Sequence, residues 1–96
     1  MKWNELSDNA KGIIEWVENP FTNKKENIEI KVGEKFERNL PKGMGFRYEK
    51  IKISITQELY DEIVKFVSND DNLEIISNDP TTKTFIFRMK ETMKLH

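Results

Sequence analysis

The chain has 96 residues, of which 36% are hydrophobic and 34% are charged, and its net charge is −1. Residues 1–96 are expected to form a single small domain, because this length supports one modest core. A nearly neutral chain gains little long-range attraction to nucleic acid or to anionic membranes, and total charge excludes wholesale mimicry of DNA. The absence of cysteine excludes disulfides and thiolate chemistry.

The first predicted element is a helix over residues 5–19, because Leu6, Ala10, Ile13 and Val17 recur at helical spacing. Ser7 or Asn4 caps its start. The following proline ends it, since the residue before a proline is pushed out of the α region. Residues 21–27 form a loop.

A strand is expected over residues 28–32, where apolar and charged residues alternate. Gly33 ends or bulges this strand. The segment 34–45 has no clean period, so we expect it to prolong the first strand as far as Arg38 and then to turn. A second strand follows over residues 46–55, with Ile51, Ile53 and Ile55 on one face.

Thr56 is a good N-cap for a second helix over residues 57–69. A hairpin then closes the chain, with strands at 73–77 and 82–90 and a turn at 78–81, where Asn-Asp-Pro is favourable turn chemistry. Residues 91–96 are expected to fray. One face of the last strand carries three large apolar residues: Phe85, Phe87 and Met89.

The predicted order is α-β-β-α-β-β, which indicates an α+β domain. Its sheet is expected to be mainly antiparallel, with the two helices packed on one face, in an arrangement related to the ferredoxin-like fold. The alternative is a winged helix, which needs one more helix than the sequence supplies.

Residue types exclude most catalytic chemistry. The only histidine is His96 at the end of the sequence, so acid–base catalysis by histidine and zinc binding are not expected. Glu58 and Glu62 are expected on a solvated helix face. Glu29-x-Lys31 on a strand is the pair that metal-dependent nucleases use, but it needs an Asp on a neighbouring strand. We therefore predict no enzyme activity, no metal site and no cofactor.

One surface stands out as a candidate binding site. Because side chains alternate along a strand, Phe46, Tyr48, Lys50 and Lys52 share the face opposite the isoleucines, and the last strand adds Arg88. The alternative is a β-bulge near Glu49, which would turn the two aromatics into the core. Two further basic residues complete the candidate site, Lys42 and Arg47.

The charges of the chain are separated along its length. Residues 35–52 hold six basic and two acidic residues, a balance of +4, whereas residues 58–71 are strongly acidic. The protein is therefore expected to be electrically two-sided, although mixed charge also serves simply to keep a small domain in solution.

The leading functional hypothesis is a non-catalytic binding module that acts by protein–protein interaction. Richness in Lys, Asn and Ile is typical of AT-rich genomes, which favours a phage or mobile-element regulator or inhibitor of a host protein. The alternatives are a single-stranded nucleic-acid-binding domain that uses the aromatic–basic face and a metal-dependent nuclease. No apolar run reaches membrane-spanning length, and no signal peptide is evident, so we expect a cytoplasmic protein without a membrane partner. Ile76 and Ile86 favour a homodimer.

Overall fold

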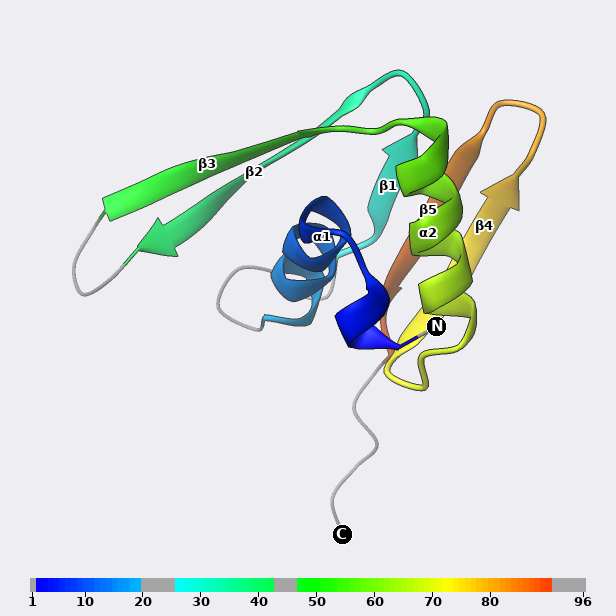
Figure 1. The fold of residues 1–96 in the computed structure, drawn as a ribbon, viewed down its shortest axis with the longest axis horizontal. Helices are drawn as coiled ribbons and strands as arrows, with labels where there is room; N and C mark the ends of the chain where they lie inside the picture. The colour runs from blue at the N-terminus through cyan, green and yellow to red at the C-terminus, as the bar shows by residue number, and fades with distance from the viewer. Residues whose placement is uncertain (1, 20–25, 43–46, 91–96) are drawn as a thin grey trace, which may run out of the picture.

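The computed structural model describes residues 2–19, 26–42 and 47–90, and for residues 40–42, 47 and 48 it describes the backbone alone. A short 3-10 turn precedes two α-helices and five strands (Figure 1). The elements are, in chain order, η1 (Trp3–Glu5), α1 (Asp8–Glu18), β1 (Ile28–Lys31), β2 (Lys35–Lys42), β3 (Arg47–Ser54), α2 (Gln57–Ser68), β4 (Leu73–Asp79) and β5 (Thr84–Met89). The α+β class and the predicted order are confirmed, with one strand more than expected between the helices.

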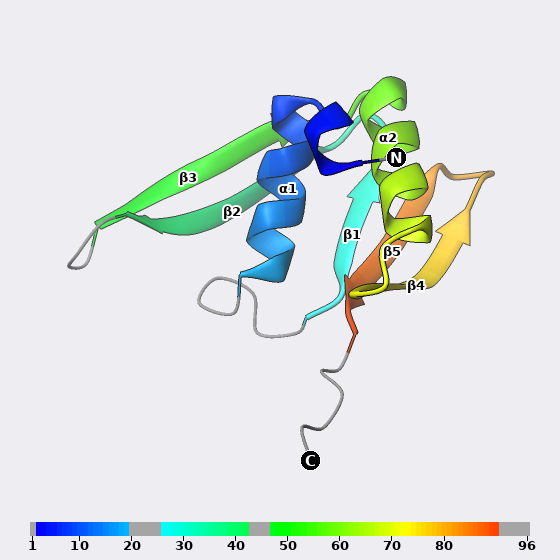
Figure 2. The ribbon, with the colours of Figure 1, turned by 60° about the horizontal axis from the view of Figure 1, so that its bottom comes forward.

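Three strands form the main sheet, in the order β1-β5-β4, and both pairings are antiparallel. Helices α1 and α2 cover one face of this sheet (Figure 2). Phe85 and Phe87 on the central strand are fully buried beneath them, and Met89 is partly buried beside them, as predicted. The described residues contain two α-helices, which is too few for the winged-helix alternative.

Both helix starts are fixed by the side chains that the sequence indicated. Ser7, rather than Asn4, caps α1 by accepting a hydrogen bond from the Ala10 amide at 3.2 Å. Thr56 caps α2 by accepting one from the Leu59 amide at 3.1 Å. Each cap satisfies an amide that has no partner within its own helix, which fixes where the helix begins.

The strand β2 is the element that the sequence pattern missed. Residues 35–42 do not prolong β1; they form a separate strand that pairs antiparallel with β3 in a second, two-stranded sheet. Along β2 the face that packs on the body carries Phe36 and then Arg38. An arginine at an inward position breaks the alternation of apolar and polar residues, and this break concealed the strand.

A tight turn redirects the chain from the main sheet into this hairpin. The amide of Glu34 donates to the carbonyl of Lys31 at 3.0 Å, which makes Gly33 the third residue of a four-residue turn. Gly33 has a φ of 94°. A type II turn requires a positive φ at this position, and glycine adopts it without steric cost.

Replacing Gly33 with alanine is expected to destabilise the protein by about 1 kcal/mol, because a side chain at positive φ is strained even where space is free. Gly12 provides the matched control. It lies within α1, and an added Cβ would meet Ile53 Cδ1 at an ordinary 3.5 Å. Gly12→Ala is expected to stabilise by about 1 kcal/mol. Urea unfolding followed by circular dichroism measures both changes, and a Gly33→Ala variant that is as stable as the native protein or more stable would contradict the assignment of the turn.

The β4–β5 hairpin turns two residues later than predicted. Asn78 continues β4, and its side chain accepts a hydrogen bond from the Tyr60 hydroxyl at 3.0 Å. Asp79 is the last residue of β4, and its carboxylate accepts hydrogen bonds from the amides of Thr81 and Thr82 in the turn at 3.0 and 3.3 Å. This local bonding by an aspartate is what sets the position of the turn.

Candidate binding surface on the β2–β3 hairpin

The paired strands β2 and β3, residues 35–42 and 47–54, extend away from the three-stranded sheet and its helices (Figure 1); we call these two strands the hairpin arm. Its ladder pairs eight residues of β2 with eight of β3, from Lys35 with Ser54 to Lys42 with Arg47. The register runs without a shift over this whole length. The arm is therefore a regular two-stranded ribbon, and the alternative of a bulge near Glu49 is wrong.

The arm is held to the body by an aromatic and cationic cluster at its root. The Trp16 indole N–H donates to the Asn39 carbonyl at 3.1 Å, and the ring meets Phe36 edge to face at 6.0 Å. The Arg38 guanidinium lies over both rings, with its Cζ 5.4 Å from the Trp16 centroid and 4.8 Å from the Phe36 centroid. Cation–π contacts of this kind favour a fixed position for the arm against α1.

The opposite face of the arm is polar and points to solvent. Lys50 and Lys52 have side-chain exposures of 62% and 56%, and Glu37 lies between them with Oε2 3.8 Å from Lys50 Nζ and Oε1 3.7 Å from Lys52 Nζ. Lys35 on β2 is also exposed. The described residues of this outward face are Lys35, Glu37, Asn39, Lys50, Lys52 and Ser54. The described part of this face is thus an exposed, net positive surface.

The structure places most of the predicted binding residues on this arm. Lys50 and Lys52 lie together on the outward face, as the alternation predicted. The backbones of Lys42, Arg47 and Tyr48 belong to the same ladder. Phe46 lies outside the described residues, and whether it and Tyr48 contribute side chains to this face stays a prediction.

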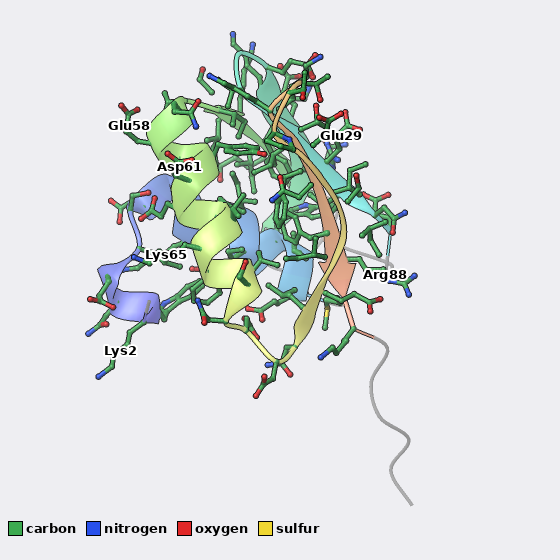
Figure 3. All side chains as sticks on the ribbon, turned by 90° about the vertical axis from the view of Figure 1, so that its right-hand side faces the viewer. Lys2, Glu29, Glu58, Asp61, Lys65 and Arg88 are labelled. Atoms are coloured by element: carbon green, nitrogen blue, oxygen red, sulfur yellow. The ribbon has the colours of Figure 1, made fainter. Side chains whose placement is uncertain are left out.

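Arg88 does not lie with the lysines. It belongs to β5 in the other sheet, where its guanidinium is hydrogen-bonded and ion-paired to the carboxylate of Glu74 on the neighbouring strand. Figure 3 shows Arg88 on the uncovered side of the main sheet, the side that also carries Glu29. The sequence pattern assumed that one sheet holds all the strands, and the division into two sheets separates these cations.

The second helix forms the negative region of the molecule. Glu58 and Asp61 lie on its outer side, away from the sheet (Figure 3). Asp70, just beyond the C-terminal end of α2, neighbours Glu18, the last residue of α1. Partial burial of Glu18 and then the carboxylate of Asp70 raise the pKa of Glu18 above its usual range. Acidic groups here repel one another, so this end offers no attraction to an anionic partner, in contrast to the arm.

The nuclease-like pair lies on the edge strand β1. In the register, Glu29 faces Ile86 and Lys31 faces Thr84, so the adjacent strand β5 does not place an aspartate beside them. Within the described residues, no group of three or more histidine, cysteine, aspartate or glutamate side chains is arranged to hold a metal ion. In the same part of the chain, neither helix combines the length and the apolar character needed to cross a membrane.

Two isoleucines are exposed on the other edge strand. Ile75 and Ile76 of β4 are 44% and 43% exposed, beside an irregularity in the pairing with β5. Ile86 on β5 is half-buried. Exposed apolar residues on an edge strand are where a second chain would pair, and homodimer formation stays a prediction.

Sequence reasoning missed the ion pairs of Glu37 with Lys50 and Lys52, because a cross-strand contact depends on the register of a strand that was not recognised.

Comparison of the chain with protein-family models, with curated proteins and with solved structures gives no match.

Proposed function

We propose that this protein is a non-catalytic binding module that docks on a partner macromolecule through the hairpin arm. The observation that carries the proposal is the outward face of the arm, where Lys35, Lys50 and Lys52 are exposed on a ribbon that projects from the body. A projecting ribbon reaches into a partner surface while the body stays clear of it. The positive face indicates that this partner surface is negatively charged.

The rigid root supports the same role. A binding element loses less entropy on association when it is held in one position beforehand. The Trp16–Phe36–Arg38 cluster provides this rigidity, since Trp16 and Phe36 are buried and Arg38 lies across both. A regulator or inhibitor of this design acts by occupying the partner's surface, and it needs no catalytic residue.

The test is capture of partners from a bacterial lysate by the tagged protein. We expect the Lys50→Glu/Lys52→Glu variant to lose the partners that the native protein retains. The matched control is Lys65→Glu/Lys83→Glu, which makes the same change in net charge at two exposed lysines away from the arm. Equal capture by both double variants would rule out the arm as the binding element. Treating the captured material with nuclease and with protease then identifies its class.

A further inference from the structure

We infer that the partner of the hairpin arm is double-stranded DNA, with the ribbon lying in the major groove. This inference rests on the proposed function, because it assigns a partner to the same surface. Lys50, Lys52 and their neighbours on the outward face provide the charge, and the regular ladder from Lys35–Ser54 to Lys42–Arg47 provides the shape.

The dimensions of the arm fit a DNA groove. Adjacent strands lie about 4.8 Å apart, and the B-DNA major groove, about 12 Å wide, admits a two-stranded ribbon. Lys50 and Lys52 lie two positions apart on β3, which corresponds to a rise of about 7 Å. That rise is close to the axial rise of two nucleotides along one DNA strand, about 3.4 Å each. Successive outward lysines are therefore spaced to follow a phosphate backbone.

The distribution of cations on the outward face favours a polyanion. In the register, Lys35 faces Ser54, Glu37 faces Lys52 and Asn39 faces Lys50, so the described part of this face carries three lysines and one carboxylate. The phosphates of a nucleic acid would complement this net positive charge.

The described residues of the outward face are polar, which favours DNA over an acidic protein. The large exposed apolar residues of the described chain are Trp3, Ile75 and Ile76, and all three lie outside the arm. Protein interfaces depend on buried aromatic or apolar anchors surrounded by a polar rim. Contacts to phosphates need charged and hydrogen-bonding groups alone, which is what Lys50, Lys52 and Asn39 offer.

The shape of the arm favours duplex DNA over duplex RNA. A two-stranded ribbon fits the major groove of B-DNA, whereas the major groove of duplex RNA is deep and narrow and excludes a ribbon. Single-stranded nucleic acid is bound by aromatic side chains that stack with bases, and a single-stranded probe in the binding experiment tests that alternative.

Glu37 is the group that DNA has to displace. It pairs with both Lys50 and Lys52 in the free protein, at 3.8 and 3.7 Å. Ion pairs this exposed contribute about 0–1 kcal/mol, so releasing the lysines costs little. Removing this carboxylate takes away the partner that the two lysines share and removes a repulsion toward phosphate. The Glu37→Gln variant should therefore bind DNA more tightly than the native protein.

The experiment is fluorescence anisotropy with a labelled mixed-sequence DNA duplex of about 20 base pairs, two helical turns, between about 50 and 200 mM salt. We expect Lys50→Gln/Lys52→Gln to weaken binding and to reduce the slope of log K against log salt by about 2, one for each phosphate contact. Glu37→Gln is expected to strengthen binding several-fold. Lys65→Gln/Lys83→Gln is the control and is expected to leave the affinity within about twofold of native. Urea unfolding establishes that every variant is folded.

Several outcomes overturn the inference. One is no binding to the duplex at the lowest salt, and another is equal binding by the Lys50→Gln/Lys52→Gln and control variants. If single-stranded DNA or duplex RNA of the same sequence binds as tightly as duplex DNA, the ribbon does not bind by insertion into the major groove, and the inference is overturned. If the duplex fails to bind while capture from lysate still depends on Lys50 and Lys52 and resists nuclease, the partner is an acidic protein; the DNA inference then fails and the proposed function stands. If capture is also independent of these lysines, both fail.

Discussion

Replacing Trp16 with alanine is expected to destabilise the protein by about 3–5 kcal/mol, the usual cost of deleting a buried tryptophan. Trp16 is buried where α1 meets the arm, and its loss removes the Phe36 ring contact, the Asn39 hydrogen bond and the surface beneath Arg38. Domains of this size are stable by only about 5–15 kcal/mol. The change therefore removes a large share of the total stability.

The effect should be concentrated on the arm. Hydrogen exchange measured by NMR is expected to show faster exchange of the β2 and β3 amides in Trp16→Ala, while amides of β5 stay protected at the level of global unfolding. Trp16→Phe keeps an aromatic ring at the root and loses the hydrogen bond to Asn39, so we expect this variant to be destabilised by about 1 kcal/mol. If Trp16→Ala exposes β3 and β5 equally, the arm is not a separately docked element.

Elements with a regular local pattern could be predicted from the sequence. Both helices repeat apolar residues at helical spacing. The sequence predicts Thr56 as the cap of the second helix and Ser7 or Asn4 as the cap of the first, and the structure has Thr56 and Ser7 at these positions. The alternation in β3 placed Ile53 in the core and Lys50 and Lys52 on the outward face. In each case the information lies within a few neighbouring residues.

The grouping of strands could not be predicted in the same way. Pairing of β1 with β5 joins Ile30 to Phe85 across most of the chain, and no local pattern encodes such a contact. β2 was missed for a different reason. Arg38 occupies an inward position of this strand, where the sequence pattern of a strand requires an apolar residue. Its guanidinium nevertheless packs over the rings of Trp16 and Phe36, as an apolar side chain would.

The candidate site was therefore recovered only in part. Its lysines follow from alternation, but its isolation on a projecting arm follows from the second sheet. The lysines are separated from Arg88 for the same reason, because Arg88 belongs to the other sheet. The change matters for function, because a face within a single sheet would suit a broad contact with another protein, whereas a narrow charged ribbon suits a groove.

Glu62 has a structural role that the sequence pattern did not reveal. It was expected on a solvated helix face, but its carboxylate accepts hydrogen bonds from the Ser7 amide at 2.7 Å and from the Ser7 hydroxyl at 2.8 Å. Ser7 is the N-cap of α1, so a carboxylate from α2 reinforces the start of the other helix. A negative group also interacts favourably with the positive end of the helix dipole.

Glu62→Ala is accordingly expected to destabilise the protein by about 2 kcal/mol, the scale of hydrogen bonds to a charged group after allowance for their exposure. The control is Glu58→Ala, one turn earlier on the same helix, where about 0.5 kcal/mol or less is expected. Urea unfolding of Glu62→Ala, Ser7→Ala and the double variant measures the coupling. Since Ser7→Ala alone already removes the hydroxyl contact with the carboxylate, the double variant should lose less than the two single changes combined. Strict additivity would mean that the two side chains stabilise α1 independently and that the contact between the helices contributes nothing.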